Sequence, residues 1–339
     1  MTYQEVLANA RECLNPNCKA CPVCNGKACG NRVPGPGAKG IGDTAIRNFE
    51  KWQQVRVNMD TICPNGTPDT SVELFGRRLA FPLVSGPIGS IRMQYNPTDD
   101  IRDFNEKCFA ACESRGLLHF YSSGIQPEIH DANIQARRAH GNCGVPIINP
   151  EADENILEQM RKCNDGLPPV AIGVVVDSAG LPHLKACNGS GGSKSVEQLR
   201  MLKENAKLPF IVKGVMTADS ARKAIDAGAD AIIVSNHGGR VLSDVPATAE
   251  VLGEIADAVA KRAKIIVDGG IRSGIDIFKA LALGADACLI CRPVLISYYG
   301  GGQEGMECYF DMLLDELKDT MYMCGARKIS DISRKMIRF

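Results

Sequence analysis

Three observations predict that this chain of 339 residues folds as an α/β protein, a (β/α)8 TIM barrel with an N-terminal extension. Eight short apolar runs alternate with longer amphipathic stretches from about residue 80 onward. The runs are nearly continuous in Val, Ile and Leu, which is typical of parallel strands buried on both faces. Two stretches, Thr217–Ser235 and Ser273–Cys291, resemble each other, and about 28 residues per strand and helix suits such a barrel. A doubly wound parallel sheet is the alternative.

The strands and helices alternate along the chain. The expected strands are Phe81–Ser85, Leu117–Ser123, Val145–Asn149, Val170–Asp177, Phe210–Lys213, Ala231–Ser235, Ile265–Asp268 and Cys288–Cys291. Between two of them, Val251, Ile255 and Val259 fall four apart and therefore line one face of a helix. We expect the last barrel helix at Gln303–Met323.

Residues 1–79 do not join this alternation. Thr2 and Glu5 have the spacing of a capping box, which predicts a short helix at the start of the chain. Asp43 is the expected N-cap of a second helix. We interpret residues 1–79 as a Cys-rich extension packed on a barrel formed by residues 80–339.

The charge balance excludes some partners. Lys and Arg together number 39, and so do Asp and Glu, so the formal net charge is zero. A nucleic-acid or anionic-membrane partner would favour a basic excess. The apolar runs are far shorter than a membrane span, and the chain does not begin like a secretory signal. We therefore expect a cytoplasmic protein that acts on a small molecule.

Polar side chains follow several predicted strands, at the end of a barrel where active sites lie. Asp177 follows the fourth run, Lys213 ends the fifth, and His237 and Arg240 follow the sixth. A single Asp or Lys in such a place is often only a salt-bridge partner. His237 is more informative, because two glycines follow it directly and Arg240 comes next.

Glycines and arginines follow the seventh and eighth strands. The seventh run leads into Gly269, Gly270 and Arg272, and the eighth into Arg292. Barrels often bind a phosphate group at this place. The pattern therefore predicts a phosphate site beside the polar cluster.

The sequence Ser-Asn-His-Gly-Gly-Arg at 235–240, with Lys213 before it and Asp-Gly-Gly-Ile-Arg at 268–272, resembles the FMN-dependent α-hydroxy acid oxidase and dehydrogenase family, typified by glycolate oxidase. The resemblance covers roughly residues 35–325 and is strongest over 209–300. It implies a barrel with FMN at its mouth, and oxidation of a 2-hydroxy acid by proton abstraction and hydride transfer to the flavin.

The resemblance also implies residue roles. By position, His237 matches the active-site base, Asp177 the carboxylate that orients it, Arg240 the clamp on the substrate's carboxylate, and Lys213 the lysine beside flavin N1 and O2. The residues expected to contact the cofactor are Pro87, Ile88, Gly89, Ser122, Lys213, Ser235, Asp268, Gly269, Gly270, Ile271, Arg272, Cys291 and Arg292.

The chain departs from the family pattern around the substrate. Val33 and Asn149 stand where the family has two tyrosines, and Leu184-Lys185 where it has a second arginine. Further departures, nearer the flavin, are Ile147, Val175 and Cys291. Each lost charge-assisted hydrogen bond weakens binding by about 1.5–3 kcal/mol. We therefore predict that glycolate and lactate are poor substrates and that the true substrate is larger or depends less on its carboxylate.

Four cysteines near the start of the chain have metal-ligand spacing. Cys18, Cys21, Cys24 and Cys29 are compatible with an iron–sulfur cluster or zinc. A reduced or partly disulfide-bonded loop is the alternative. The family pattern does not include this segment.

The sequence therefore favours an FMN-dependent enzyme acting on a hydroxyl-bearing carbon, with an unidentified electron acceptor. An FMN-dependent reductase or isomerase, and a flavin- or metal-binding redox sensor, are the alternatives. The family resemblance implies a homo-oligomer, often a tetramer.

Overall fold

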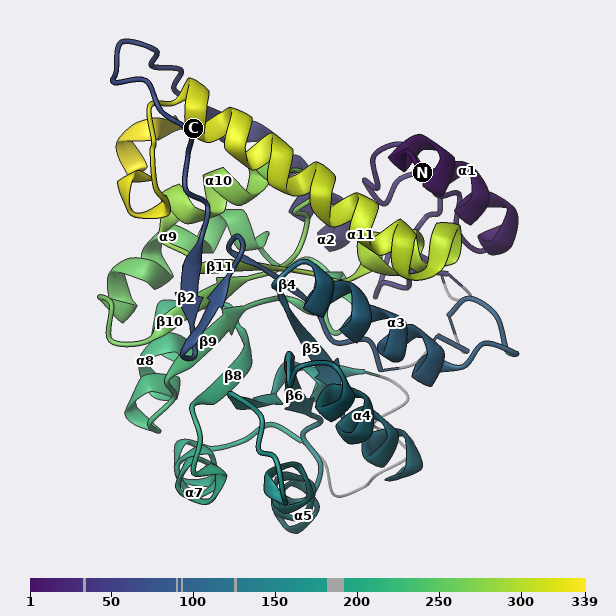
Figure 1. Cartoon of the computed structure of the whole chain (residues 1–339). Helices are drawn as coiled ribbons and strands as arrows, with labels where there is room; N and C mark the ends of the chain where they lie inside the picture. The colour runs from purple at the N-terminus through teal and green to yellow at the C-terminus, as the bar shows by residue number, and fades with distance from the viewer. Residues whose placement is uncertain (33–34, 90, 93, 125–126, 182–191) are drawn as a thin grey trace.

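The structure of the chain, a computed structural model, describes residues 1–339 except 33–34, 90, 93, 125–126 and 182–191. A closed barrel of eight strands forms its centre, in the order β10-β11-β4-β5-β6-β7-β8-β9 (Figure 1). The strands are β4 (Leu83–Ser85), β5 (Leu118–Ser122), β6 (Gly144–Ile148), β7 (Ile172–Val175), β8 (Phe210–Val215), β9 (Ala231–Val234), β10 (Lys264–Val267) and β11 (Ala287–Ile290). Neighbouring strands are parallel throughout. Each strand overlaps one apolar run, so the predicted barrel is confirmed over the doubly wound alternative.

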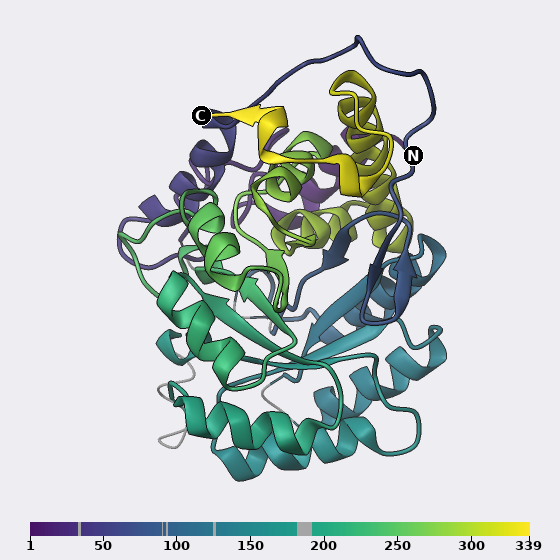
Figure 2. The same ribbon diagram turned by 90° about the vertical axis from the view of Figure 1, so that its left-hand side faces the viewer.

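Helices surround the barrel, as the two views in Figures 1 and 2 show. They are α3 (Ile101–Ser114), α4 (Pro127–Ala139), α5 (Asp153–Asn164), α7 (Val196–Ala206), α8 (Ala218–Asp226), α9 (Thr248–Val259), α10 (Gly274–Leu283) and α11 (Arg292–Met323). Val251, Ile255 and Val259 of α9 are all buried, as their spacing predicts. In the described part of the chain, no helix is both long and apolar enough for a membrane span.

The last helix is longer than predicted. It covers the expected Gln303–Met323 but begins at Arg292. Its helical geometry is interrupted at Gly301 and Gly302. These glycines break the amphipathic pattern in the sequence, which is why the first part of α11 was not predicted.

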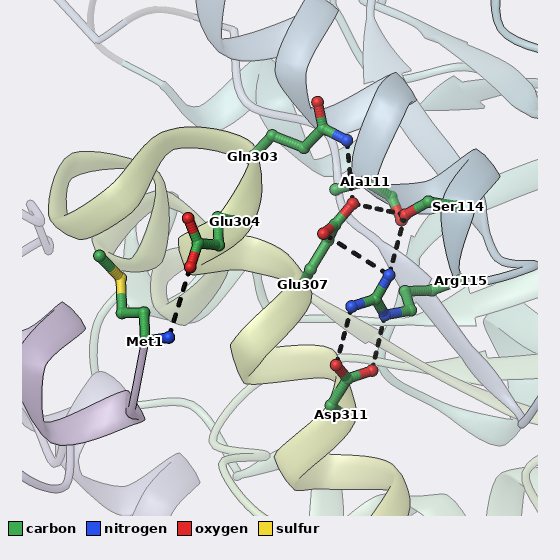
Figure 3. A network of polar contacts seen from close by, with 8 residues as sticks. All are labelled: Met1, Ala111, Ser114, Arg115, Gln303, Glu304, Glu307 and Asp311. Atoms are coloured by element: carbon green, nitrogen blue, oxygen red, sulfur yellow. Dashed lines mark hydrogen bonds and ion pairs between the residues drawn. The ribbon is translucent and has the colours of Figure 1, made fainter.

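Polar contacts join α11 to α3 (Figure 3). The guanidinium of Arg115 donates to both carboxylate oxygens of Asp311, at 2.6 and 2.9 Å. The hydroxyl of Ser114 donates to Glu307 at 2.6 Å. Arg115 also lies 3.5 Å from Glu307, so one short network connects the two helices. It fixes the first and last helices of the barrel side by side.

The N-terminal residues contribute two helices. In α1 (Tyr3–Leu14), Thr2 and Glu5 form the predicted capping box. For α2 (Asp43–Gln54) the prediction was off by one residue, because the N-cap is Gly42 with a left-handed backbone. The first of these helices lies against α11 (Figure 1).

Short strands complete the fold outside the barrel. The strand β1 (Arg56–Val57) pairs antiparallel with β12 (Ile337–Arg338), and β2 (Val72–Leu74) pairs with β3 (Arg77–Leu79). The C-terminal strand therefore pairs with a strand from residues 1–79. The proposed division between residues 79 and 80 stays a prediction. Two 3-10 turns, Ile329–Asp331 and Arg334–Met336, precede β12.

Candidate active site

A cavity of about 380 Å³ lies where the predicted site residues meet. Its wall includes every predicted catalytic, substrate-binding and cofactor-binding residue except Asp177 and Ser235. The predicted residues in the wall are Pro87, Ile88, Gly89, Ser122, Lys213, His237, Arg240, Asp268, Gly269, Gly270, Ile271, Arg272, Cys291 and Arg292. Asp177 and Ser235 lie directly behind it, in contact with wall residues. Residues that are far apart in the sequence therefore form one site.

His237 is paired with Asp177. The ring Nδ1 lies 3.0 Å from Oδ1 of Asp177, which begins the 3-10 turn after β7. A carboxylate only accepts hydrogen bonds, so Nδ1 carries the proton and Nε2 keeps its lone pair. Burial lowers the pKa of His237 below its ordinary value, although Asp177 opposes the shift. The imidazole is therefore neutral near pH 7 and can accept a proton at Nε2.

Burial alone would raise the pKa of Asp177, but the charge of Lys213 and the interaction with His237, including its hydrogen bond, hold this pKa below its usual range. Asp177 is therefore an anion at neutral pH. It can stabilise the imidazolium that forms when His237 takes a proton.

Lys213 brings a buried positive charge into the cavity. Its side chain is only 4% exposed. The ammonium donates to Ser235 at 2.7 Å and lies 3.1 Å from Asp268. Burial alone would lower the pKa of Lys213, but Asp268 and Asp177 raise it above its ordinary value. The lysine therefore stays charged.

Arg240 follows His237 in a tight turn. The backbone N–H of Arg240 donates to the carbonyl of His237, within the 3-10 turn His237–Gly239. Its guanidinium meets the amide oxygen of Gln94, at 3.3 Å from Nη1 and closer still from Nη2, once that amide is oriented to satisfy both groups. No carboxylate of the described residues forms an ion pair with it. A buried guanidinium without an anionic partner suits an incoming carboxylate.

The turn after β10 is shaped by two glycines. A Cβ at Gly270 would lie 2.2 Å from the backbone oxygen of Asn48, so only glycine lets α2 approach this closely. Both Gly269 and Gly270 have positive φ, at +86° and +84°. This packs α2 directly against the turn that carries Gly269 and Gly270.

The chain matches one family over most of its length. Residues 36–183 and 184–339 match the FMN-dependent dehydrogenase family. The chain belongs to this family. It is therefore an FMN-dependent oxidoreductase, as the resemblance implied.

Members of the family from different organisms are similar to the chain. A peroxisomal (S)-2-hydroxyacid oxidase of Arabidopsis thaliana is 46% identical over 330 residues, covering 87% of this chain and 88% of that protein. A 4-hydroxymandelate oxidase of Amycolatopsis orientalis is 41% identical over 294 residues, covering 78% and 81%. The crystal structure of a mandelate oxidase with (S)-2-phenylpropionate has a TM-score of 0.79 at 26% identity, covering 99% of this chain and 97% of that one.

The cavity of this chain has polar groups without partners that FMN could bind. Oδ1 of Asp268 is buried and has no hydrogen-bond partner among the described residues. An ammonium has three N–H bonds, and two of those on Lys213 point to Ser235 and Asp268. The walls between these groups carry aliphatic side chains such as Ile88 and Leu289. A flat ring system with polar edges would use both features.

The predicted phosphate arginines are held by the N-terminal segment. Nε of Arg272 donates to the backbone oxygen of Cys24 at 2.7 Å, and Nη1 of Arg292 donates to the side chain of Asn31 at 3.3 Å. Both arginines line the cavity, as predicted. Their binding of the FMN phosphate stays a prediction.

The departures from the family pattern also line the cavity where the structure describes them. Ile147, Asn149 and Val175 are in its wall. Burial raises the pKa of Cys291, also in the wall, to about 12, so this residue adds a neutral thiol. Val33 and Leu184-Lys185 lie outside the described residues.

The structure does not support a metal at the four N-terminal cysteines. Among the described residues, no group of three or more His, Cys, Asp or Glu could hold a metal ion. Sγ of Cys18 accepts from the N–H of Ala20 at 3.5 Å, and Sγ of Cys24 faces Arg272 at 3.9 Å. The described cysteines, which include Cys21 and Cys29, are free thiols. The metal prediction therefore finds no support among the described residues.

Sequence reasoning missed several wall residues. Gln94 and Tyr95 follow β4, and residues 36–39 belong to the extension. None of them ends a strand or belongs to a motif. The available signal was an aromatic residue, Tyr95, six positions after the predicted flavin-contacting segment Pro87–Gly89.

Proposed function

We propose that the chain oxidises a 2-hydroxy acid to the 2-oxo acid. The observation that carries this proposal is the His237–Asp177 pair, with its free Nε2, in the same cavity as Arg240. Among the described residues, the guanidinium of Arg240 has no anionic partner. Arg240 would hold the carboxylate through two parallel hydrogen bonds and so fix the adjacent carbon that bears the hydroxyl. When bound, FMN supplies the acceptor for the hydride that leaves this carbon.

The proton takes a separate path. Nε2 of His237 accepts the proton of the substrate's hydroxyl, and Asp177 stabilises the resulting imidazolium. The positive charge of Lys213 would stabilise negative charge on the isoalloxazine ring. Each group is already held in place by its neighbours, so little rearrangement is needed during the reaction.

We also propose that the substrate is larger than glycolate or lactate. Asn149 replaces a tyrosine of the family pattern, and apolar wall residues such as Pro36, Ala38 and Leu181 offer a surface for a sizeable side chain. The similarity to enzymes named for hydroxymandelate and mandelate supports an aromatic 2-hydroxy acid.

Stopped-flow measurement of flavin reduction tests this proposal. Under anaerobic conditions, glycolate, L-lactate, (S)-mandelate and 4-hydroxymandelate are compared as reductants. We expect slow reduction by the two small acids and fast, saturable reduction by an aromatic one. Fast reduction by glycolate or L-lactate at low concentration would contradict the size argument, and no reduction by any acid would contradict the function.

Molecular oxygen is the electron acceptor that we propose, because the similar proteins are named oxidases. Peroxide formation during turnover in air tests it. We further propose that the protein is located in the cytoplasm, because free thiols suit a reducing compartment, and cell fractionation tests this location. We also propose that the chain forms a homo-oligomer, and light scattering measures its oligomeric state.

A further inference from the structure

Two adjacent residues beside Arg240 have no role in the site described so far. Gln94 and Tyr95 lie on the loop between β4 and α3, and both line the cavity. We propose that they form, with Arg240, the binding site for the substrate's carboxylate, with the hydroxyl of Tyr95 as a hydrogen-bond donor to it. This deepens the function proposed above and rests on it.

Gln94 positions the guanidinium. Its amide oxygen accepts from both Nη atoms of Arg240. A neutral amide satisfies these donors without neutralising the charge, so Arg240 remains attractive to an anion. A carboxylate makes a stronger charge-assisted bond with a guanidinium than an amide does. An incoming carboxylate can therefore displace the oxygen of Gln94, whose NH2 group then becomes available as a donor.

Tyr95 is a buried residue of the cavity wall and lies close to positive charge. Its side chain is 5% exposed, and among the described residues its hydroxyl forms no hydrogen bond. The phenol lies near the guanidinium groups of Arg240 and Arg292. Burial raises the pKa of Tyr95 well above its ordinary value, so the group is a neutral donor at working pH. A hydroxyl donor in the cavity wall, close to two cations, suits an anionic ligand.

The loop holds Tyr95 firmly. Its N–H donates to the carbonyl of Ile91 at 2.8 Å, and its carbonyl accepts from the side chain of Asn17 at 2.6 Å. The ring packs against Tyr299 with centroids 5.8 Å apart, and Tyr299 is itself hydrogen-bonded to Asp99. Tyr95 is held by two backbone hydrogen bonds and by the packing of its ring, so its side chain is preorganised to bind a small group.

The position of Tyr95 also bears on a tyrosine of the family pattern that this chain lacks. Asn149 stands where the family has a tyrosine, and its amide donates to the carbonyl of Gly124 at 3.2 Å. The amide of Asn149 is therefore already engaged with a backbone carbonyl. In the proposed site, Tyr95 supplies a tyrosine hydroxyl to the carboxylate from a different loop.

Oxalate binding tests the proposal without turnover. Oxalate is an anion that cannot be oxidised by hydride loss, and its binding to the FMN-loaded protein can be followed by the flavin absorbance. We expect Tyr95→Phe to raise the Kd of oxalate about ten- to a hundredfold, the loss of one hydrogen bond to a charged group. Tyr298→Phe is the matched control, because its hydroxyl donates to Asp103 outside the cavity. It should leave the Kd unchanged.

A second pair of variants tests Gln94. In Gln94→Glu the new carboxylate would pair with Arg240 and compete with the ligand, raising the Kd of oxalate more than tenfold. Gln94→Leu keeps Arg240 unneutralised and should have a much smaller effect. Equal effects of the two variants would overturn the assignment of Gln94.

The outcomes separate this inference from its alternatives. If Tyr95→Phe weakens FMN binding but not oxalate binding, the hydroxyl serves the phosphate and the proposal is wrong. An unchanged Kd for both ligands would also overturn it. If oxalate binding weakens as expected while no hydroxy acid reduces the flavin, the carboxylate site stands and the proposed function fails. A methyl ester of the best acid gives a further check, because its reduction rate should respond little to Tyr95→Phe.

Discussion

The imidazole of His237 is fixed both through its ring and through its backbone. Its Nδ1 donates to Asp177, and its backbone N–H donates to Ser235 at 3.1 Å. The backbone has a φ of +56°, a conformation that residues other than glycine rarely adopt. Such geometry persists where the surroundings hold it, and it is common at functional sites. The position of Nε2 is therefore set before substrate arrives.

Replacing His237 by asparagine tests its role as the base. We expect His237→Asn to retain FMN but to slow flavin reduction about a hundredfold or more, because the substrate's proton has no acceptor. The measurement is stopped-flow reduction with the best hydroxy acid. His140→Asn is the control, since His140 contacts Glu106 and Glu113 outside the cavity. Equal rates in His237→Asn and the natural chain would return His237 to a structural role.

The pH dependence of reduction follows from the same residue. Burial lowers the pKa of His237 below its ordinary 6.5, with Asp177 opposing. The neutral form is active, so kcat/KM should rise with pH through this pKa and stay level from about pH 6.5 upward. In Asp177→Asn the opposing charge is lost, so the remaining activity should have its acid limb at still lower pH. An acid limb above pH 6.5 in the natural chain would contradict this assignment.

At the scale of elements, the strands and their ends were predictable and the loops were not. Buried parallel strands have continuous apolar sequences, and a residue that follows such a run must lie at the barrel mouth. This rule located Lys213 and His237. It could not locate Gln94 or Tyr95, because their loop is placed by contacts with distant residues such as Asn17.

The pairing of α1 with α11 depends on close backbone approach. A Cβ at Gly300 would lie 2.0 Å from the backbone oxygen of Val6. We expect Gly300→Ala to lower the free energy of unfolding by about 1–3 kcal/mol, because the two helices must separate. Urea denaturation measures this change in the free energy of unfolding, from the midpoint and from the slope of the free energy against urea concentration.

Gly253→Ala is a matched control for that change. It lies within α9, and its nearest contact would be Arg334 at 3.9 Å, so no clash arises. Replacing a helical glycine by alanine should leave stability unchanged or raise it by up to about 1 kcal/mol. If Gly300→Ala were as stable as Gly253→Ala, the close helix contact would not exist in solution.

At the scale of the whole molecule, the extension and the barrel share one site. The indole N–H of Trp52 donates to the carbonyl of Gly269 at 2.8 Å, and Cys24 accepts from Arg272. These contacts join residues more than two hundred positions apart. The sequence pattern of the barrel does not predict these contacts. The N-terminal segment could therefore be predicted as an extension of the barrel, but its contribution to the cavity wall could not.

Because several parts of the chain meet at this cavity, ligand binding there should stabilise the entire fold. A ligand that binds only the native state adds about 2.7 kcal/mol at a concentration of 100 times its Kd. We therefore expect FMN-free protein to melt at lower temperature, with Tm rising as FMN is added. Riboflavin, which lacks the phosphate, should raise Tm less at equal concentration.

The variant Arg292→Ala distinguishes binding of the FMN phosphate from binding of the flavin ring. If Arg292 binds the phosphate, this variant should lose most of the additional gain in Tm that FMN gives over riboflavin, while its response to riboflavin stays unchanged. Lys213→Ala should instead reduce the response to both ligands, because Lys213 is expected to contact the ring. Thermal denaturation at a series of ligand concentrations measures both variants. An Arg292→Ala protein that still distinguishes FMN from riboflavin as the natural chain does would place the phosphate elsewhere.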